Sequence, residues 1–403
     1  MNGFQWQHHQ AEIEDRRFLI ITQFIFSLSI LAAVFLKGTV PALADGSEPF
    51  VEPPLERFAK NKSNVEVDAP TLDRMEKIAD SYRRRGLYSY AEAIIQDVFE
   101  IRQKLKGPDD PEMAYYHNDL GFLQAEQGKY AEAESQYLKA IAITENHWGA
   151  NHPDLADQLN NLAGIYRSEA RYAEAEKLYQ RCITIWEKYS GSDHPNVALA
   201  LNNLGGLYAL QGHYALAEAL FQRALRIQEK ELGMESREIT TAVNNLAWVY
   251  NKQGKFTQAE ALYKRLVKIW VETYGPEHPD VAIGLNNLGM VYRSLGDPDR
   301  AELFFLQALT IREKFLGPEH PDVGTTLKNL AELYREEGRS EEAEPLYNRA
   351  VAILEKALGK DHPDVAETRT GYARLAAGPQ EKNSANETGA NSDTMPAKSG
   401  IVH

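Results

Sequence analysis

The chain has 403 residues, of which 43% are hydrophobic and 25% charged, and these values exclude a collagen-like or wholly disordered chain. It carries 44 Lys and Arg against 58 Asp and Glu, a formal net charge of −14. This balance argues against nucleic acid as a general partner, because phosphate binding needs concentrated positive charge. The single cysteine, Cys182, excludes an intramolecular disulfide framework and a cysteine-rich zinc site.

Residues 1–44 have the order of an export signal. Arg16-Arg17 precedes an apolar run from Phe18 to Leu36, and the small-residue sequence Ala42-Leu43-Ala44 follows. The pattern predicts a signal peptide cleaved after Ala44, and the alternative is an uncleaved membrane anchor. Because the basic residues precede the apolar run, both versions predict export. The cleaved protein would be periplasmic or extracellular, and the uncleaved one would be membrane-anchored and face away from the cytoplasm.

Two segments without apolar periodicity flank the middle of the chain. Residues 45–70 contain four prolines and scattered charges, which predicts an extended linker. Residues 378–403 are rich in Asn, Ser, Gly, Ala and Thr, which predicts a disordered tail. The folded domain is therefore expected at 71–377.

This middle part repeats with a period of 42 residues. An alanine returns at that spacing in every unit, and a turn glycine in all units except the one that has Ala170. In residues 281–316, apolar residues have helical spacing on both sides of Gly296-Asp297-Pro298. Each unit is therefore predicted to be a helix, a tight turn and a second helix, and neighbouring units must stack to cover their apolar faces. The prediction is an all-α solenoid of about seven helix pairs, capped by a last helix at 364–375.

The repeat pattern resembles that of a known family. One unit shows the small, aromatic and glycine positions in order: Ala331, Tyr334, Gly338, Ala343, Tyr347 and Ala350. This resembles the tetratricopeptide repeat, and the 42-residue length with the sequence from Leu316 to Val323 resembles the kinesin light chain subgroup. The resemblance covers about 72–375 and implies a right-handed superhelix whose first helices line a concave peptide-binding groove. Motor cargo transport is not implied, because an export signal and not a heptad coiled coil precedes the repeats.

The recurring His-Pro-Asp sequence is predicted to be a structural turn. It stands at 152–154, 278–280, 320–322 and 362–364, with His-Pro-Asn at 194–196. Pro suits the first position of a helix, and Asp in the first turn complements the helix dipole. Histidines one repeat apart are too distant to share a zinc ion, so no metal site is predicted.

No catalytic or cofactor site is predicted either. Cys182 occupies a slot that alanine fills in other units, which indicates a small buried residue rather than a nucleophile. The sequence has no phosphate-binding loop after a strand and no nucleophile elbow. The chain is therefore expected not to be an enzyme and to need no cofactor.

A ladder of asparagines is the main candidate binding feature. Its members are Asn160 and Asn161, Asn202 and Asn203, Asn244 and Asn245, Asn286 and Asn287, and the single Asn329. Each amide offers a donor and an acceptor, so it can pair with the backbone of an extended peptide. The alternative is that these amides bond neighbouring helices and hold the repeats together.

Basic residues share the predicted face of this ladder. Arg167, Arg293 and Arg335 predict an acidic or C-terminal-carboxylate partner, with Trp248 as a candidate anchor. The alternative is that the arginines pair with Glu126, Glu332 or Glu336.

The predicted function is a non-catalytic scaffold that binds an extended peptide or a flexible segment of another protein. Alternatives are a structural subunit of an envelope or secretion complex and an accessory factor for anionic polysaccharide. Contact with a membrane is expected only through an uncleaved N-terminal segment.

Overall fold

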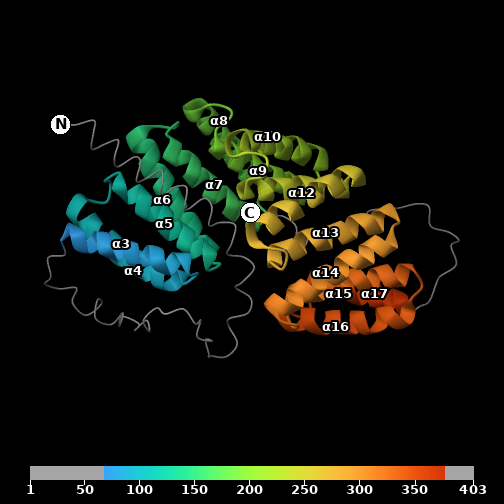
Figure 1. Ribbon diagram of the computed structural model, residues 1–403. Coiled ribbons are helices and arrows are strands. Elements are labelled where there is room, and N and C mark those ends of the chain that lie inside the picture. The colour runs from blue at the N-terminus through green and yellow to red at the C-terminus, as the bar shows by residue number, and fades with distance from the viewer. Residues whose placement is uncertain (1–67, 377–403) are drawn as a thin grey trace. The chain divides into compact units, whose positions relative to one another are not determined.

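The computed structural model describes residues 68–376, which form helices joined by short turns and contain no strand. The all-α prediction is confirmed. Figure 1 shows these helices in chain order. They divide into two compact units, 68–185 and 186–376, and each is described separately below. The predicted signal segment, the predicted tail and the predicted linker up to residue 67 lie outside the described residues.

Fifteen α-helices follow one another in the described residues, as seven pairs and one last helix. The first helices of the pairs are α3 (Ala69–Arg84), α5 (Glu112–Glu126), α7 (Pro153–Ser168), α9 (Pro195–Leu210), α11 (Thr240–Lys252), α13 (Pro279–Leu295) and α15 (Pro321–Glu336). The second helices are α4 (Tyr88–Lys106), α6 (Tyr130–Trp148), α8 (Tyr172–Ser190), α10 (Tyr214–Leu232), α12 (Phe256–Tyr274), α14 (Pro298–Leu316) and α16 (Ser340–Leu358). A 3₁₀ turn, Arg237–Ile239, precedes α11, and α17 (Pro363–Ala376) ends the series.

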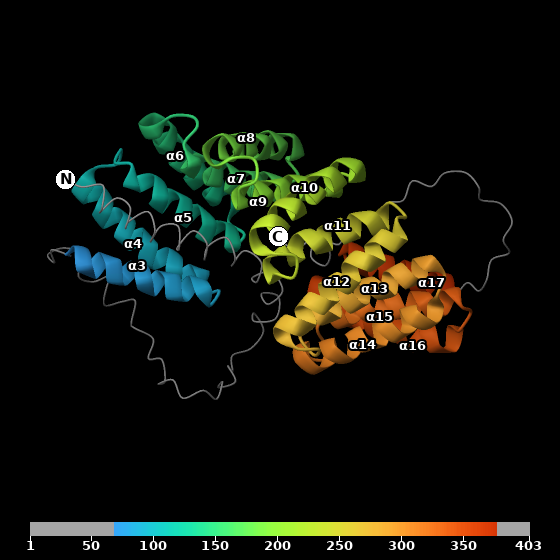
Figure 2. The ribbon, with the colours of Figure 1, turned by 45° about the horizontal axis from the view of Figure 1, so that its top comes forward.

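Consecutive helices pack side by side in each unit (Figure 2). In residues 186–376 the backbones of successive first helices also meet, α9 with α11, α11 with α13, α13 with α15, and α15 with α17. The second helices of that unit have no comparable contact with one another. The first helices therefore form a tighter layer, as expected for the inner side of a curved stack.

The His-Pro-Asp turns are helix starts, as predicted. In each of them Pro is the first helical residue, and the histidine before it is the N-cap, whose Nδ1 accepts a hydrogen bond from the backbone N–H two residues later. For His320 this bond to the Asp322 N–H is 3.2 Å long. Ser236 has the same role before the 3₁₀ turn. The Nδ1 atom of each of these histidines is therefore used by the backbone.

Small residues allow the two helices of a repeat to come close. A Cβ placed on Gly289 of α13 would lie 2.6 Å from the Phe305 ring of α14, so a side chain there would displace the ring. Phe305 itself is fully buried. Phe305 and Ala301 of α14 both belong to the core that extends over residues 209–347.

Candidate protein-binding surface

Hydrogen bonds between asparagines connect successive first helices. Asn287 Nδ2 donates to Asn244 Oδ1 at 3.3 Å, and Asn329 Nδ2 donates to Asn286 Oδ1 at 3.1 Å. In the first unit, Asn161 donates to Asn118 at 3.2 Å. We call each such bond a rung. The second asparagine of one repeat thus bonds the first asparagine position of the repeat before it, as the alternative reading of the ladder expected.

Asn118 was not among the predicted site residues, although it stands 42 residues before Asn160. The residue after it is Asp119, so only half of the pair pattern is visible there. Of the predicted residues, Asn160, Asn161 and Asn203 are half-buried, and Asn202, Asn244, Asn245, Asn286, Asn287 and Asn329 are buried. A peptide-binding role for these amides stays a prediction.

The rung between α9 and α11 is not made. Asn202 Oδ1 and Asn245 Oδ1 are both buried without a hydrogen-bond partner in the described residues, and these two side chains are 6% and 1% exposed. Asn251 Oδ1, near the end of α11, and the Oε1 atoms of Gln228 and Gln253 are further buried oxygens without a partner in this unit. A buried polar atom that lacks a partner is uncommon and needs an explanation.

In α5 an acidic side chain, Asp119, stands at the second asparagine position of the repeat. Asp119 is buried and pairs with Arg83 at 2.7 Å, and Arg83 also contacts Asp80. Burial raises the pKa of Asp119, and the adjacent Arg83 guanidinium opposes that shift. This ion pair connects α3 to α5, where the later repeats use neutral amides.

Two of the predicted basic residues have acidic neighbours. Arg335 Nη2 lies 2.7 Å from Glu332 and 3.7 Å from Glu336, and Arg293 Nε lies 3.7 Å from Glu336. This is the arrangement that the alternative reading of the arginines expected. Arg167 is half-buried in the last turn of α7.

Trp248 lies mostly within the core. Its side chain is 7% exposed and packs edge-on against Tyr214, with ring centroids 5.8 Å apart. The Lys252 ammonium lies 5.5 Å from the centre of the Trp248 ring. Little of the indole is therefore open to a partner.

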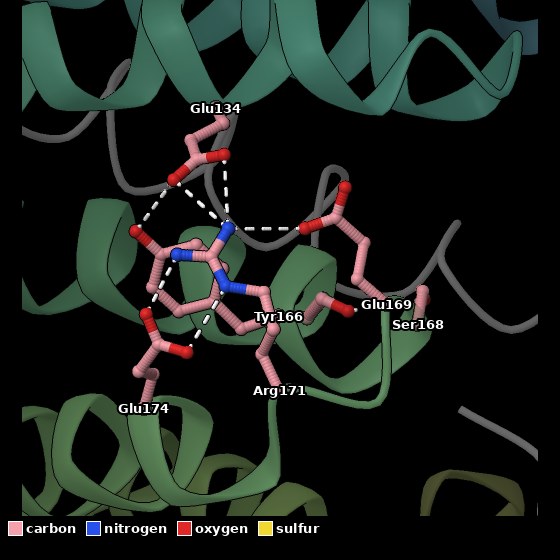
Figure 3. A network of polar contacts seen from close by, with 7 residues as sticks. Glu134, Tyr166, Ser168, Glu169, Arg171 and Glu174 are labelled. Carbon is pink, nitrogen blue, oxygen red and sulfur yellow. Dashed lines mark hydrogen bonds and ion pairs between the residues drawn. The ribbon is translucent and has the colours of Figure 1, made fainter.

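Ion-pair clamps fix the turn inside a repeat to the second helix of the repeat before it. In Figure 3 the Arg171 guanidinium contacts Glu134 of α6 at 3.1 Å and also bonds Glu169 and Glu174. It covers the Tyr166 ring at 3.7 Å, and the Tyr166 hydroxyl donates to Glu134. Arg339 makes the matching clamp in the second unit with Glu302, Glu337, Glu342 and Tyr334.

Other residues singled out in the sequence have structural positions. Cys182 is buried, and burial raises the pKa of its thiol well above the ordinary value. Within residues 68–376, no group of three or more His, Cys, Asp or Glu side chains is placed to hold a metal ion. No helix of this range is both long and apolar enough to cross a membrane.

Comparison with solved structures finds chains of similar structure. BtubC (BKLC) from P. vanneervenii is 25% identical with a TM-score of 0.48, covering 66% of this chain and 98% of its own. A putative kinesin light chain from Podosopora anserina with nearly identical TPR-like repeats is 27% identical with a TM-score of 0.46, covering 51% and 97%. The apo form of RapI is 17% identical with a TM-score of 0.53, covering 71% and 98%, a likeness of fold alone. No curated protein matches the chain.

The tetratricopeptide repeat model matches residues 71–146, 154–230, 238–314, 304–356 and 322–388. These matches cover most of the chain, and they agree with the helix pairs described above. The fold is that of a protein–protein interaction scaffold, typically without catalytic activity. The chain belongs to the tetratricopeptide repeat family.

Proposed function

We propose that the protein binds an extended segment of another protein along the first helices of residues 186–376. The observation that carries this proposal is the continuous layer of first helices with asparagines at each step. Packed helices are about 8–10 Å apart, and an extended chain advances about 3.3 Å per residue. One asparagine position could therefore serve about every third residue of the bound segment.

Each rung uses only part of its donor amide. In the rung to Asn244, the Asn287 side chain donates one of its two N–H groups. A ladder position can therefore join two repeats and still offer a donor to a carbonyl of the ligand backbone.

The other predicted functions receive less support. An acidic partner or an anionic polysaccharide would need basic side chains without counter-charges, but Arg293 and Arg335 have carboxylate neighbours. We further propose that the partner is met outside the cytoplasm, because Arg16-Arg17 and the apolar run after it have the order of an export signal.

The test is a triple variant, Asn203→Ala with Asn245→Ala and Asn287→Ala, compared with Asn348→Ala on the exposed side of α16. Binding of a displayed random-peptide library to the full chain is expected to fall several-fold in the triple variant only, since each lost hydrogen bond is worth about 1 kcal/mol. Circular dichroism would check that the helical signal is kept. Unchanged binding together with a lower Tm would show that the ladder is only structural.

A further inference from the structure

We propose that the segment held by α9, α11 and α13 is uncharged and apolar, an extended stretch of aliphatic and small residues with free backbone N–H groups. This inference rests on the proposed function and names the class of its partner. Charge, side-chain character and hydrogen-bonding capacity of the three helices support it.

The three helices are almost free of charge in a protein that is 25% charged. Helix α9 contains no charged residue, α11 contains only Lys252, and α13 contains only Asp280 and Arg293. Asp280 lies in the first turn of α13, 3.6 Å from His278, and Arg293 pairs with Glu336. The Lys252 ammonium lies over the Trp248 ring, 5.5 Å from its centre. This surface therefore offers few charges to a charged group of a ligand.

Apolar side chains stand beside the asparagines on the same helices. Leu199, Ile283 and Met290 are half-buried, and Leu210 at the end of α9 is 37% exposed. This character ends at α15, where Lys328 stands at the position of Asn286 and Glu332 at the position of Met290. The surface therefore matches apolar side chains over the length of three repeats.

The missing hydrogen bond between Asn202 of α9 and Asn245 of α11 also supports the proposal. Its two unpaired atoms, Asn202 Oδ1 and Asn245 Oδ1, are both acceptors, and so is Asn251 Oδ1 beyond them. A ligand that satisfies them must bring donors. The backbone N–H groups of an extended peptide are donors, whereas carboxylates and sugar acids at neutral pH offer mainly acceptors. In the other rungs the later asparagine donates to the earlier one, so a bond of this kind from Asn245 to Asn202 would compete with the ligand.

The experiment selects a phage library of random nine-residue segments on the full chain. Uncharged apolar segments are expected to be enriched. One selected segment is then synthesised with N-methyl groups at alternate backbone nitrogens, which removes donors without changing side chains. Its affinity is expected to fall by about tenfold or more, because each lost hydrogen bond has a cost.

Two matched variants locate the binding. Leu210→Glu places a charge at the end of α9, and Leu216→Glu places the same charge on α10, where Leu216 is 52% exposed. Only Leu210→Glu should weaken the selected segment by about tenfold. Two results would overturn this inference and leave the proposed function standing. One is the enrichment of charged segments whose affinity changes in Leu210→Glu. The other is an affinity of the selected segment that N-methylation does not change. If no segment is selected, or if both variants bind the selected segments as the unmodified chain does, the proposed function fails with it.

Discussion

Ala170 stands where the other repeats have their turn glycine. It has φ of +59°, in a turn whose equivalents are glycines such as Gly212 with φ of +76°. A side chain in the left-handed region costs about 1–2 kcal/mol. We expect Ala170→Gly to raise the free energy of unfolding by up to about 1 kcal/mol, after the extra freedom of glycine in the unfolded chain is subtracted. Thermal unfolding monitored by circular dichroism measures the change in stability. A lower Tm for Ala170→Gly would contradict the prediction. Gly212→Ala is the matched change in the opposite direction.

At the scale of one element, the histidine caps set where several first helices begin. His320 accepts from the Asp322 N–H, and Ser236 makes the equivalent bond to the Glu238 N–H with its hydroxyl. We therefore expect His320→Ser to keep most of the stability and His320→Ala to lose about 1 kcal/mol, the usual value of an N-cap. The Tm values of the two variants test this. Equal losses in both would show that the ring contributes by packing and not by its nitrogen.

The helices themselves were predictable, and the details of their starts less so. The 42-residue period and the break at Gly296-Asp297-Pro298 identified two helices per unit, and α13 and α14 lie on either side of that break. The Pro and Asp of the turn were interpreted correctly. The histidines were predicted to be structural, but their capping role was not, because only the position of Nδ1 beside a backbone N–H shows it.

At the scale of the whole molecule, the clamps make the stacking of repeats sensitive to acid. Hydrogen bonds from Arg339 hold the pKa values of Glu302 and Glu342 below the ordinary value of 4.5. A carboxyl whose pKa is lowered on folding stabilises the folded state above its unfolded pKa, and this contribution is lost as the pH falls through the folded value. We therefore expect Tm to fall below about pH 4.5, and Arg339→Gln to make this fall shallower.

Tm measured between pH 7 and pH 3 for both proteins tests that expectation. Burial raises the pKa values of Asp119 and Glu126. Protonation of these two carboxyls therefore favours the folded state as the pH falls. They are present in both proteins, so the difference between the two curves isolates the clamp. Parallel curves would show that the Arg339 clamp adds nothing to stability in solution.

The candidate surface was only partly predictable at this scale. Spacing placed the asparagines on first helices at regular steps, but it cannot tell which way an amide points. The structure was needed to show that Asn287 bonds Asn244 while Asn202 and Asn245 keep unpaired oxygens. The acidic neighbours of Arg293 and Arg335 were predictable as an alternative because Glu332 and Glu336 lie on the same helix as Arg335.

The bonds between repeats described above have one more consequence. The Arg171 clamp reaches back 37 residues to Glu134, and the Asn329 rung reaches back 43 residues to Asn286. Each of these bonds joins a repeat to the adjacent repeat. A duplicated 42-residue unit would therefore carry both the residues that bond the repeat before it and the residues that bond the repeat after it. Gene duplication could therefore lengthen or shorten such an array by whole units without redesign of any existing junction, and the reach of the protein could evolve separately from its stability.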